Sequence, residues 1–205
     1  MPDAEYLYRL VCGHFFDLEW NDSSFHALWC RGLGEEAVAR RLGARMDSAV
    51  EQTLEQWLRS PNVGLLEQRM WIGTVDDWVW VLPAGWRLLD DEILAGLSRD
   101  DGQVLDIIWD ISGNYLLTYA TDGRILTRFD PCFPREREGV DPHALDHLMA
   151  GLRFELADPD DRPPGGEVTV EESLSSAFVL AGRLVGRQID DEWFSGIHTC
   201  YHFKA

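Results

Sequence analysis

The sequence predicts an α+β protein: an antiparallel meander sheet of about five to six strands, flanked by N- and C-terminal helices. Residues 69–130 are dense in aromatic and β-branched side chains, which favour strands, and they hold five of the nine tryptophans. Turn dipeptides such as Asp122-Gly123 separate short apolar runs in this block. The segments on either side show helical spacing of apolar residues, without a regular alternation of strand and helix.

The N-terminal part is expected to be mainly helical. Residues 4–16 carry apolar side chains at helical spacing, and residues 25–30 read as a short apolar strand. A helix follows over 35–43, because acids occupy its first turn, arginines its last, and glycine its end. Residues 47–59 repeat this apolar spacing and are predicted to form one further helix.

The central block is expected to form the sheet. Its runs are short and are bounded by Asp, Gly, Ser and Asn, as in hairpins. The expected strands span residues 65–75, 77–82, 104–111, 115–120 and 125–130. Asp122-Gly123 predicts a two-residue type I′ turn. The acids that begin at Asp90 predict a short helix between the two hairpins.

The C-terminal part returns to helices. Asp141-Pro142 predicts a helix from there to about Arg153, with proline at its first position. Residues 158–166 are acidic and rich in proline and glycine, which predicts a surface linker. A long helix is expected over 169–186 and a short one after Asp190. Residues 197–205 are expected to form a polar C-terminal tail.

Length and charge limit the classes of function. The 205 residues fit a single domain, 1–205, and the net charge of −18 comes from 36 acidic and 18 basic residues. Such a surface repels phosphate backbones and anionic lipids, so neither nucleic acid nor a membrane is an expected partner. A basic protein partner would be attracted and steered. The edges of the sheet leave a homodimer open.

The cysteines and the N-terminus predict a cytoplasmic protein. Cys12, Cys30, Cys132 and Cys200 lie far apart in the sequence and form no CxxC pair. The first residues lack the basic and apolar regions of a signal peptide. The sequence has no run of about 18 apolar residues that would span a membrane. Reduced thiols are therefore expected.

Several segments resemble a family of uncharacterised actinobacterial proteins, known only as a domain of unknown function. The resemblance covers roughly residues 25–195. It rests on 28–36 with 41–44, 77–82 with Gly85-Trp86, Asp122-Gly123, 127–131, and Asp141-Pro142 with Leu145. This resemblance implies a single cytoplasmic domain and transfers no catalytic residue. The polar tail after Phe194 departs from the pattern.

Three tryptophans are candidates for a binding surface. Trp78 and Trp80 alternate with valines in one strand and so share one face of the sheet, and Trp109 lies in another strand. Core packing is the favoured interpretation of these rings. The alternative is a ligand pocket or a protein interface, where tryptophan is enriched.

A group of arginines near the proline-containing loop is a second candidate. Arg128, Arg135 and Arg137 surround Asp130 in the sequence. Guanidinium groups hold carboxylate or phosphate bidentately, so this group would suit an anionic ligand. The favoured alternative is that the arginines pair with Glu136, Glu138 and Asp141 and fix the loop.

Metal binding is weakly indicated, and no cofactor is expected. His143 and His147 are four apart on the predicted helix, which would place them on one face. His198, Cys200 and His202 would point the same way in an extended tail. A solvated helix face and a mobile tail are the favoured interpretations, and His26 with Cys30 is interpreted as packing. No GxSxG, phosphate-loop or GxGxxG motif is present.

Two functional hypotheses follow. The first is a non-enzymatic protein-binding module, such as an immunity or antitoxin-like inhibitor or an adaptor, whose acidic surface holds a basic partner. The second is a small-molecule-binding protein or an enzyme with a pocket on the tryptophan-rich face of the sheet. What covers the second face of the sheet would separate these hypotheses.

Overall fold

The computed structural model describes residues 4–15, 25–59, 69–84, 89–110, 112–156 and 167–203. The strands are β1 (Phe25–Arg31), β2 (Val50–Thr53), β3 (Arg69–Val75), β4 (Trp78–Ala84), β5 (Gln103–Trp109), β6 (Tyr115–Thr121), β7 (Arg124–Phe129), β8 (Arg137–Glu138) and β9 (Ile197–His202). The helices are α1 (Tyr6–Phe15), α2 (Glu35–Arg41), the 3-10 turn η1 (Met46–Ser48), α3 (Leu54–Arg59), α4 (Asp91–Leu97), α5 (Asp146–Met149), α6 (Val170–Val185) and α7 (Asp191–Ser195).

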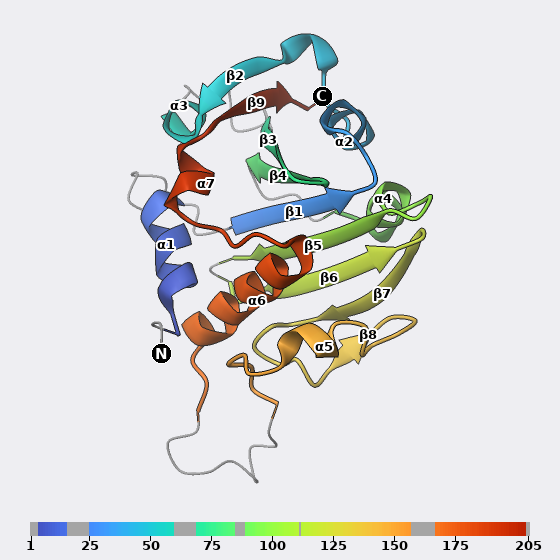
Figure 1. The fold of residues 1–205 in the computed structure, drawn as a ribbon, viewed down its shortest axis with the longest axis vertical. Helices are drawn as coiled ribbons and strands as arrows, with labels where there is room; N and C mark the ends of the chain where they lie inside the picture. The colour runs from blue at the N-terminus through green and yellow to red at the C-terminus, as the bar shows by residue number, and fades with distance from the viewer. Residues whose placement is uncertain are drawn as a thin grey trace.

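One antiparallel sheet organises the molecule (Figure 1). Within the described residues it has nine strands, in the order β2-β9-β3-β4-β1-β5-β6-β7-β8. The α+β class is confirmed, but the sheet is larger than expected and only its β5–β8 part is a meander. Strand β1 lies between β4 and β5, and β9 lies between β2 and β3. These two insertions bring both ends of the chain into the sheet.

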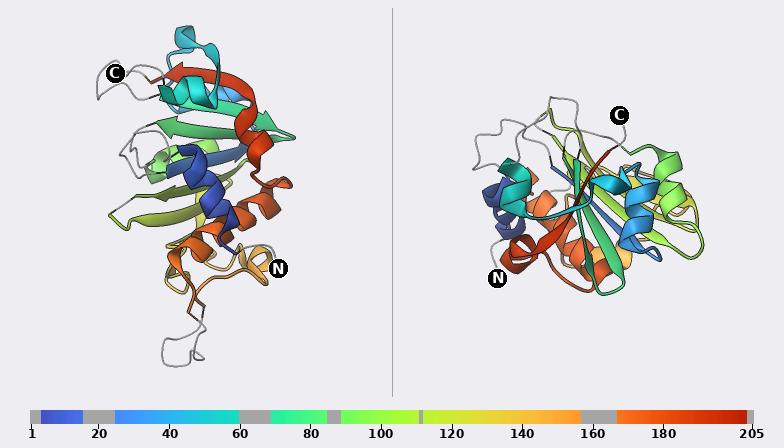
Figure 2. Two further views of the ribbon diagram at one scale, coloured as in Figure 1. Left: turned by 90° about the vertical axis from the view of Figure 1, so that its left-hand side faces the viewer. Right: turned by 90° about the horizontal axis from the view of Figure 1, so that it is seen from above.

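Both faces of the sheet are covered by the chain's own helices, on opposite sides in Figure 2. The first face carries aromatic side chains and packs against α1, α3, α5, α6 and α7. The second face is mainly aliphatic and packs against α2 and α4. Alternation along each strand produces this division, because successive side chains point to opposite faces. The second face is therefore covered by helices.

Signals that depend only on neighbouring residues, such as turn dipeptides and helix caps, correctly predicted the local structure. The Asp122-Gly123 turn has φ of 51° and 72°, the left-handed backbone that a type I′ turn requires. Thr169 begins α6 with a capping box to Glu172, which confirms the helix expected over 169–186. Within the described part of the chain, no helix is long and apolar enough to cross a membrane.

The single helix predicted over 47–59 is wrong. Residues 46–59 divide into η1, strand β2 and helix α3. Strand β2 pairs with β9, and Thr53 caps α3 by accepting a hydrogen bond from the Gln56 N–H at 3.2 Å. Pairing with a distant strand has overridden the helical spacing of the apolar side chains.

The long helix predicted from Asp141 is also wrong, because only the short α5 forms there. The Asp141 N–H donates to the carbonyl of Leu126 at 2.9 Å, which ties the chain to the end of the sheet. Successive turns follow before Asp146, where α5 begins. Backbone hydrogen bonds from Val140 and Asp141 to β7 hold this segment beside the sheet, and turns rather than a continuous helix follow it.

The expected C-terminal tail contains a strand. Residues 197–202 form β9, which is paired on one side with β2 and on the other with β3. Its side chains alternate, so Cys200 joins the core of the first face and Tyr201 that of the second. The linker expected over 158–166 lies outside the described residues.

Candidate functional site

The three candidate tryptophans are core residues. Trp78, Trp80 and Trp109 are all buried in the cluster of the first face. The ring of Trp80 lies 4.4 Å from that of Trp193 on α7 and 5.0 Å from that of Trp71. These rings attach helices to the sheet, so they present no surface to a partner.

The arginine group is divided between the two faces. Arg128 lies on the second face, where its Nε donates to Thr118 Oγ1 at 3.1 Å and its guanidinium pairs with Asp91. Arg137 lies opposite Phe129 in the sheet and stands over its ring on the first face. Arg135 is exposed and makes its own contact. Arg128 and Arg137 therefore lie on opposite faces of the sheet, and they do not form the cluster that the sequence predicted.

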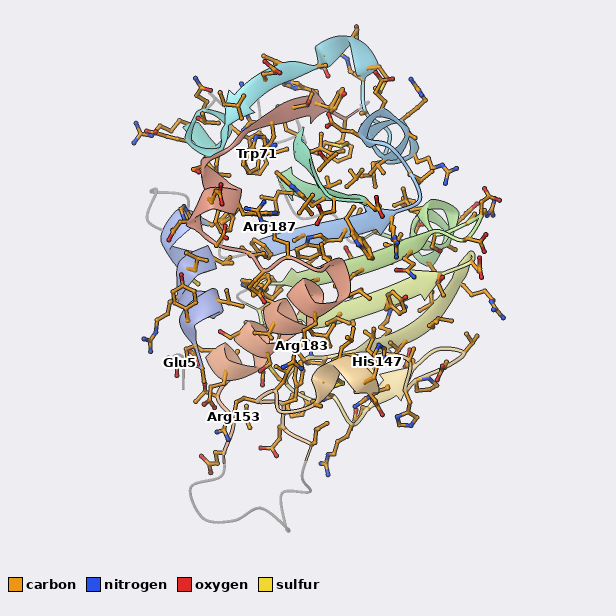
Figure 3. All side chains as sticks on the ribbon, in the orientation of Figure 1. Glu5, Trp71, His147, Arg153, Arg183 and Arg187 are labelled. Carbon is orange, nitrogen blue, oxygen red and sulfur yellow. The ribbon has the colours of Figure 1, made fainter. Side chains whose placement is uncertain are left out.

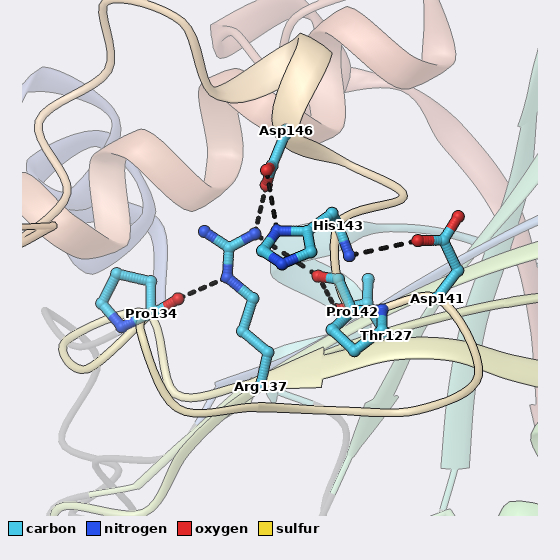
Figure 4. A network of polar contacts seen from close by, with 7 residues as sticks. All are labelled: Thr127, Pro134, Arg137, Asp141, Pro142, His143 and Asp146. Carbon is cyan, nitrogen blue, oxygen red and sulfur yellow. Dashed lines mark hydrogen bonds and ion pairs between the residues drawn. The ribbon is translucent and has the colours of Figure 1, made fainter.

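Arg137 fixes the proline-containing loop, as favoured from the sequence (Figure 4). Its guanidinium bonds to the carbonyl of Pro134 and to the carboxylate of Asp146, and reaches the carbonyl of Pro142 at 3.4 Å. The Arg137 hydrogen bond holds the pKa of Asp146 below its ordinary value. Asp146, rather than the acids nearest in sequence, is the charged partner.

His143 and His147 do not converge, whereas alternation along β9 places His198, Cys200 and His202 on one face, as expected. His143 contacts Asp146 at 2.9 Å, whereas the exposed His147 extends from α5 (Figure 3), so they do not share a helix face. His198 packs between Trp71 and Trp80, and burial lowers its pKa. Among the described residues, no group of three or more His, Cys, Asp or Glu side chains could hold a metal ion.

Asp130 belongs to a different group, which we call the acidic end. Its members come from α1, from the start of β6, from the loop after β7 and from the first turn of α6. They are Tyr8, Cys12, Tyr115, Asp130, Cys132 and Glu171. Helices α1 and α6 are joined here by a 2.9 Å hydrogen bond from the Tyr8 N–H to Ser175 Oγ. The Cys132 N–H donates to Asp130 Oδ1 at 2.7 Å and shapes the loop.

The electrostatics of the acidic end are one-sided. Burial raises the pKa of Tyr8 to about 12, and a hydrogen bond with Cys12 and the nearby carboxylate of Glu171 raise it further. Burial, followed by the charge of Asp130, raises the pKa of Cys132 to about 12. Burial also raises the pKa of Asp130. No described cation contributes to the shifts at these groups. The thiols and phenols of this group are neutral at neutral pH, so its negative charge can come only from the carboxylates of Asp130 and Glu171.

Exposed apolar side chains adjoin the acidic end in the sequence. Phe133 follows Cys132 and is 66% exposed, and Val170 precedes Glu171 and is 40% exposed. Tyr6, in the first turn of α1, is exposed to 48%. Exposed aromatic and apolar side chains therefore lie close in the chain to acids that have no cationic partner among the described residues.

None of the cysteines is poised as a nucleophile. All four are free, and burial raises the pKa of each thiol. A reactive cysteine needs a lowered pKa, because the thiolate is the nucleophile. Thiol catalysis is accordingly not supported at Cys12 or Cys132, although both lie at the acidic end.

The structure adds a buried polar pair that sequence reasoning missed. Nε2 of His26 on β1 lies 2.6 Å from Oδ1 of Asp106 on β5, and both side chains are buried in the second face. Asp106 faces Thr118 across the sheet, and Thr118 faces Arg128. His26 Nδ1 is buried without a hydrogen-bond partner among the described residues. The available signal was a lone acid within the apolar run 104–109.

The fold and these sites define an α+β protein with one antiparallel sheet, closed by its own helices on both faces and acidic at one end. The chain belongs to the family described as "Family of unknown function (DUF6461)", whose model matches residues 16–198. Comparisons with curated proteins and with solved structures give no match.

Proposed function

We propose that this protein is a binding module that holds a basic protein partner at the acidic end. The observation that carries the proposal is the absence of any described cation among the charges acting on these groups. Several acids elsewhere have a cationic partner, as Asp146 has Arg137 and Glu172 has Arg153. Uncompensated acids lower stability by mutual repulsion, so a partner that supplies the missing charge would relieve this cost.

The middle of the aromatic face is a poor alternative site. Helices α1, α6 and α7 contribute apolar side chains to the same cluster as the tryptophans of that face. A partner or substrate could reach Trp80 only by displacing α7, because Trp193 lies against it. The acidic end requires no such displacement, since Phe133 is already exposed beside it.

The chemistry of the site specifies the partner. Arginine or lysine side chains would meet Asp130 and Glu171, and adjacent apolar side chains would meet Phe133 and Val170. An inhibitor of a basic toxin, or an adaptor for a basic protein, fits this description. A homodimer through this end is disfavoured, because two like-charged surfaces repel. A cytoplasmic location fits the four free cysteines.

Binding of defined basic peptides tests the proposal. The probes are short synthetic peptides in which arginine alternates with leucine, measured by fluorescence anisotropy at low and physiological ionic strength. The double variant Asp130→Asn/Glu171→Gln is expected to bind at least about tenfold more weakly, since two charge-assisted contacts are lost.

A matched control separates this site from general attraction to an acidic protein. Glu36→Gln/Glu55→Gln removes the same number of charges from helices α2 and α3, where both acids have arginine partners. Its affinity should stay close to that of the unmodified protein. Equal loss in both double variants, or no measurable binding, would refute a site at the acidic end.

A further inference from the structure

A cleft opens between helices α2 and α4, which Figure 2 shows on the same side of the sheet. Its volume is about 410 Å³, which is within the range of small-molecule sites. One lining residue ends α2, and the others belong to α4 and to the turn that follows it. They are Arg41, Glu92, Ile93, Gly96, Arg99 and Asp100. Neither helix contributes a member to the acidic end.

The backbone on both sides of the cleft is held by hydrogen bonds. Arg41 donates through Nη1 to the carbonyl of Gly96 at 2.7 Å, which ties the end of α2 to α4. The turn after α4 is tied to the turn between β6 and β7, where the Gly123 N–H donates to the carbonyl of Ser98 at 3.2 Å. Arg99 lies against that turn, since a Cβ placed on Gly123 would be 3.2 Å from its Cγ. Both arginines therefore start from fixed backbone, which favours a preformed site.

The charged residues of the cleft do not pair with one another. Among the described residues, none of its two arginines and two acids forms an ion pair. The neighbouring Asp91, by contrast, pairs with Arg128. Opposite charges that line one space without meeting leave donors and acceptors available to a ligand that carries both signs.

Gly96 keeps the cleft open between these charges. Glycine is less favourable than alanine in a helix, and Gly96 lies in the last turn of α4 without a left-handed backbone that would require it. A Cβ placed on Gly96 would meet nothing within 4 Å, so close packing does not require glycine either. Ile93, one turn earlier, supplies a partly buried apolar side chain to the same cleft. Apolar surface between a few charged groups is typical of small-molecule sites.

We propose that this cleft binds a small zwitterion with one carboxylate and one ammonium group, such as a free amino acid. The two guanidiniums would hold the carboxylate, because their paired N–H donors match its two oxygens. The carboxylates of Glu92 and Asp100 would accept hydrogen bonds from the ammonium group, and an apolar side chain of the ligand would lie against Ile93. The basic partner proposed for the acidic end uses other residues, so either proposal can fail without the other.

NMR titration of the full chain with L-leucine tests the site. The amide signals of Gly96 and Arg99 are expected to shift and saturate, while that of Tyr115 at the acidic end stays in place. Acetate and methylammonium each carry only one of the two charges. At the same ionic strength each should bind at least about tenfold more weakly than leucine, because one set of charge-assisted contacts is missing. Equal affinity for leucine and acetate, or shifts that never saturate, would overturn the proposal.

Two variants separate binding in the cleft from weak attraction to surface charge. Arg99→Gln is expected to keep the melting temperature and to weaken leucine binding at least about tenfold, since it removes a carboxylate donor. Gly96→Met should fold and lose the leucine response, because its side chain would fill the open space. The control Arg40→Gln removes an arginine of α2 that pairs with Glu36 and does not line the cleft, so it should bind normally. Unchanged binding in both variants, or an equal loss in the control, would contradict the assignment.

Discussion

The two faces of the sheet are both buried, yet they differ in chemistry. Every tryptophan of the described residues lies in the cluster of the first face, where five helices pack. The second face is built from aliphatic side chains under α2 and α4, and it also carries the buried pair of His26 and Asp106. Large aromatic side chains bury much surface each, which suits the face that has more helices to attach.

This difference changes how the aromatic residues should be interpreted. Tryptophan density alone suggested a surface for ligands or partners, but the rings pack against one another and against helices. The features that packing does not explain are polar. They are the acidic end and the ring nitrogen of His26 that has no hydrogen-bond partner among the described residues. Buried polar groups of this kind cost stability, which makes them better indicators of function than apolar ones.

Removing a central ring should have the largest effect. Trp80→Ala is expected to destabilise the protein by about 4 kcal/mol, because a large cavity would form between Trp71, Trp193 and His198. On the second face, Ile72→Val should cost only about 1 kcal/mol. Urea unfolding measures both. Similar costs would show that the aromatic face does not have the greater role in packing.

The buried polar pair should show strong coupling. Asp106→Leu is expected to cost about 3 kcal/mol, since it leaves the ring of His26 buried without its partner. The double variant His26→Leu/Asp106→Leu should recover much of this loss, because no unpaired polar group remains. A double-mutant cycle in urea unfolding gives the coupling energy. Additive losses would contradict the contact between the two side chains.

Loss of the contacts that fix the loop at Arg137 should lower the free energy of unfolding less than loss of the buried pair. Arg137→Met is expected to cost about 2 kcal/mol, through its hydrogen bonds to Pro134 and Asp146. Arg31→Met breaks only an exposed pair with Asp77 at 3.6 Å and should cost about 0.5 kcal/mol. Chemical denaturation compares the two variants. An equal cost would mean that Arg137 does not fix the loop.

The smallest expected effect is the contribution of His198 to the pH dependence of stability. Burial lowers the pKa of His198 below its ordinary value, so below that ordinary value the unfolded state binds more protons than the folded state. Stability should therefore fall as the pH drops from about 7.5 towards 5.5. His198→Gln should weaken this dependence, whereas exposed His147→Gln should leave it unchanged. Identical pH profiles for all three proteins would exclude a contribution from His198.

The sequence predicted what local signals determine. The Asp122-Gly123 turn and the capping box at Thr169 depend on neighbouring residues, and both were recognisable. The division of 47–59 and the strand at 197–202 depend on pairing between segments far apart in the chain. No local pattern carries that information, because a short apolar run serves a helix or a buried strand equally well.

The candidate sites were also hard to predict, because their members come from segments far apart in the chain. Asp130 was recognised, but its companions Tyr8 and Glu171 come from helices at opposite ends of the chain. The pair of His26 and Asp106 requires the register of β1 against β5. Trp78 and Trp80 were correctly placed on one face, while the helices that cover them were not assigned to it.

Chemical-shift mapping during titration with the arginine–leucine peptides tests the central claim most directly. The proposal predicts that shifts concentrate at Tyr8, Tyr115, Cys132 and Glu171, with the exposed Phe133 beside them. The indole N–H signals of Trp78, Trp80 and Trp109 should remain in place, because these rings are core residues. Movement of those indole signals without change at the acidic end would contradict the proposal.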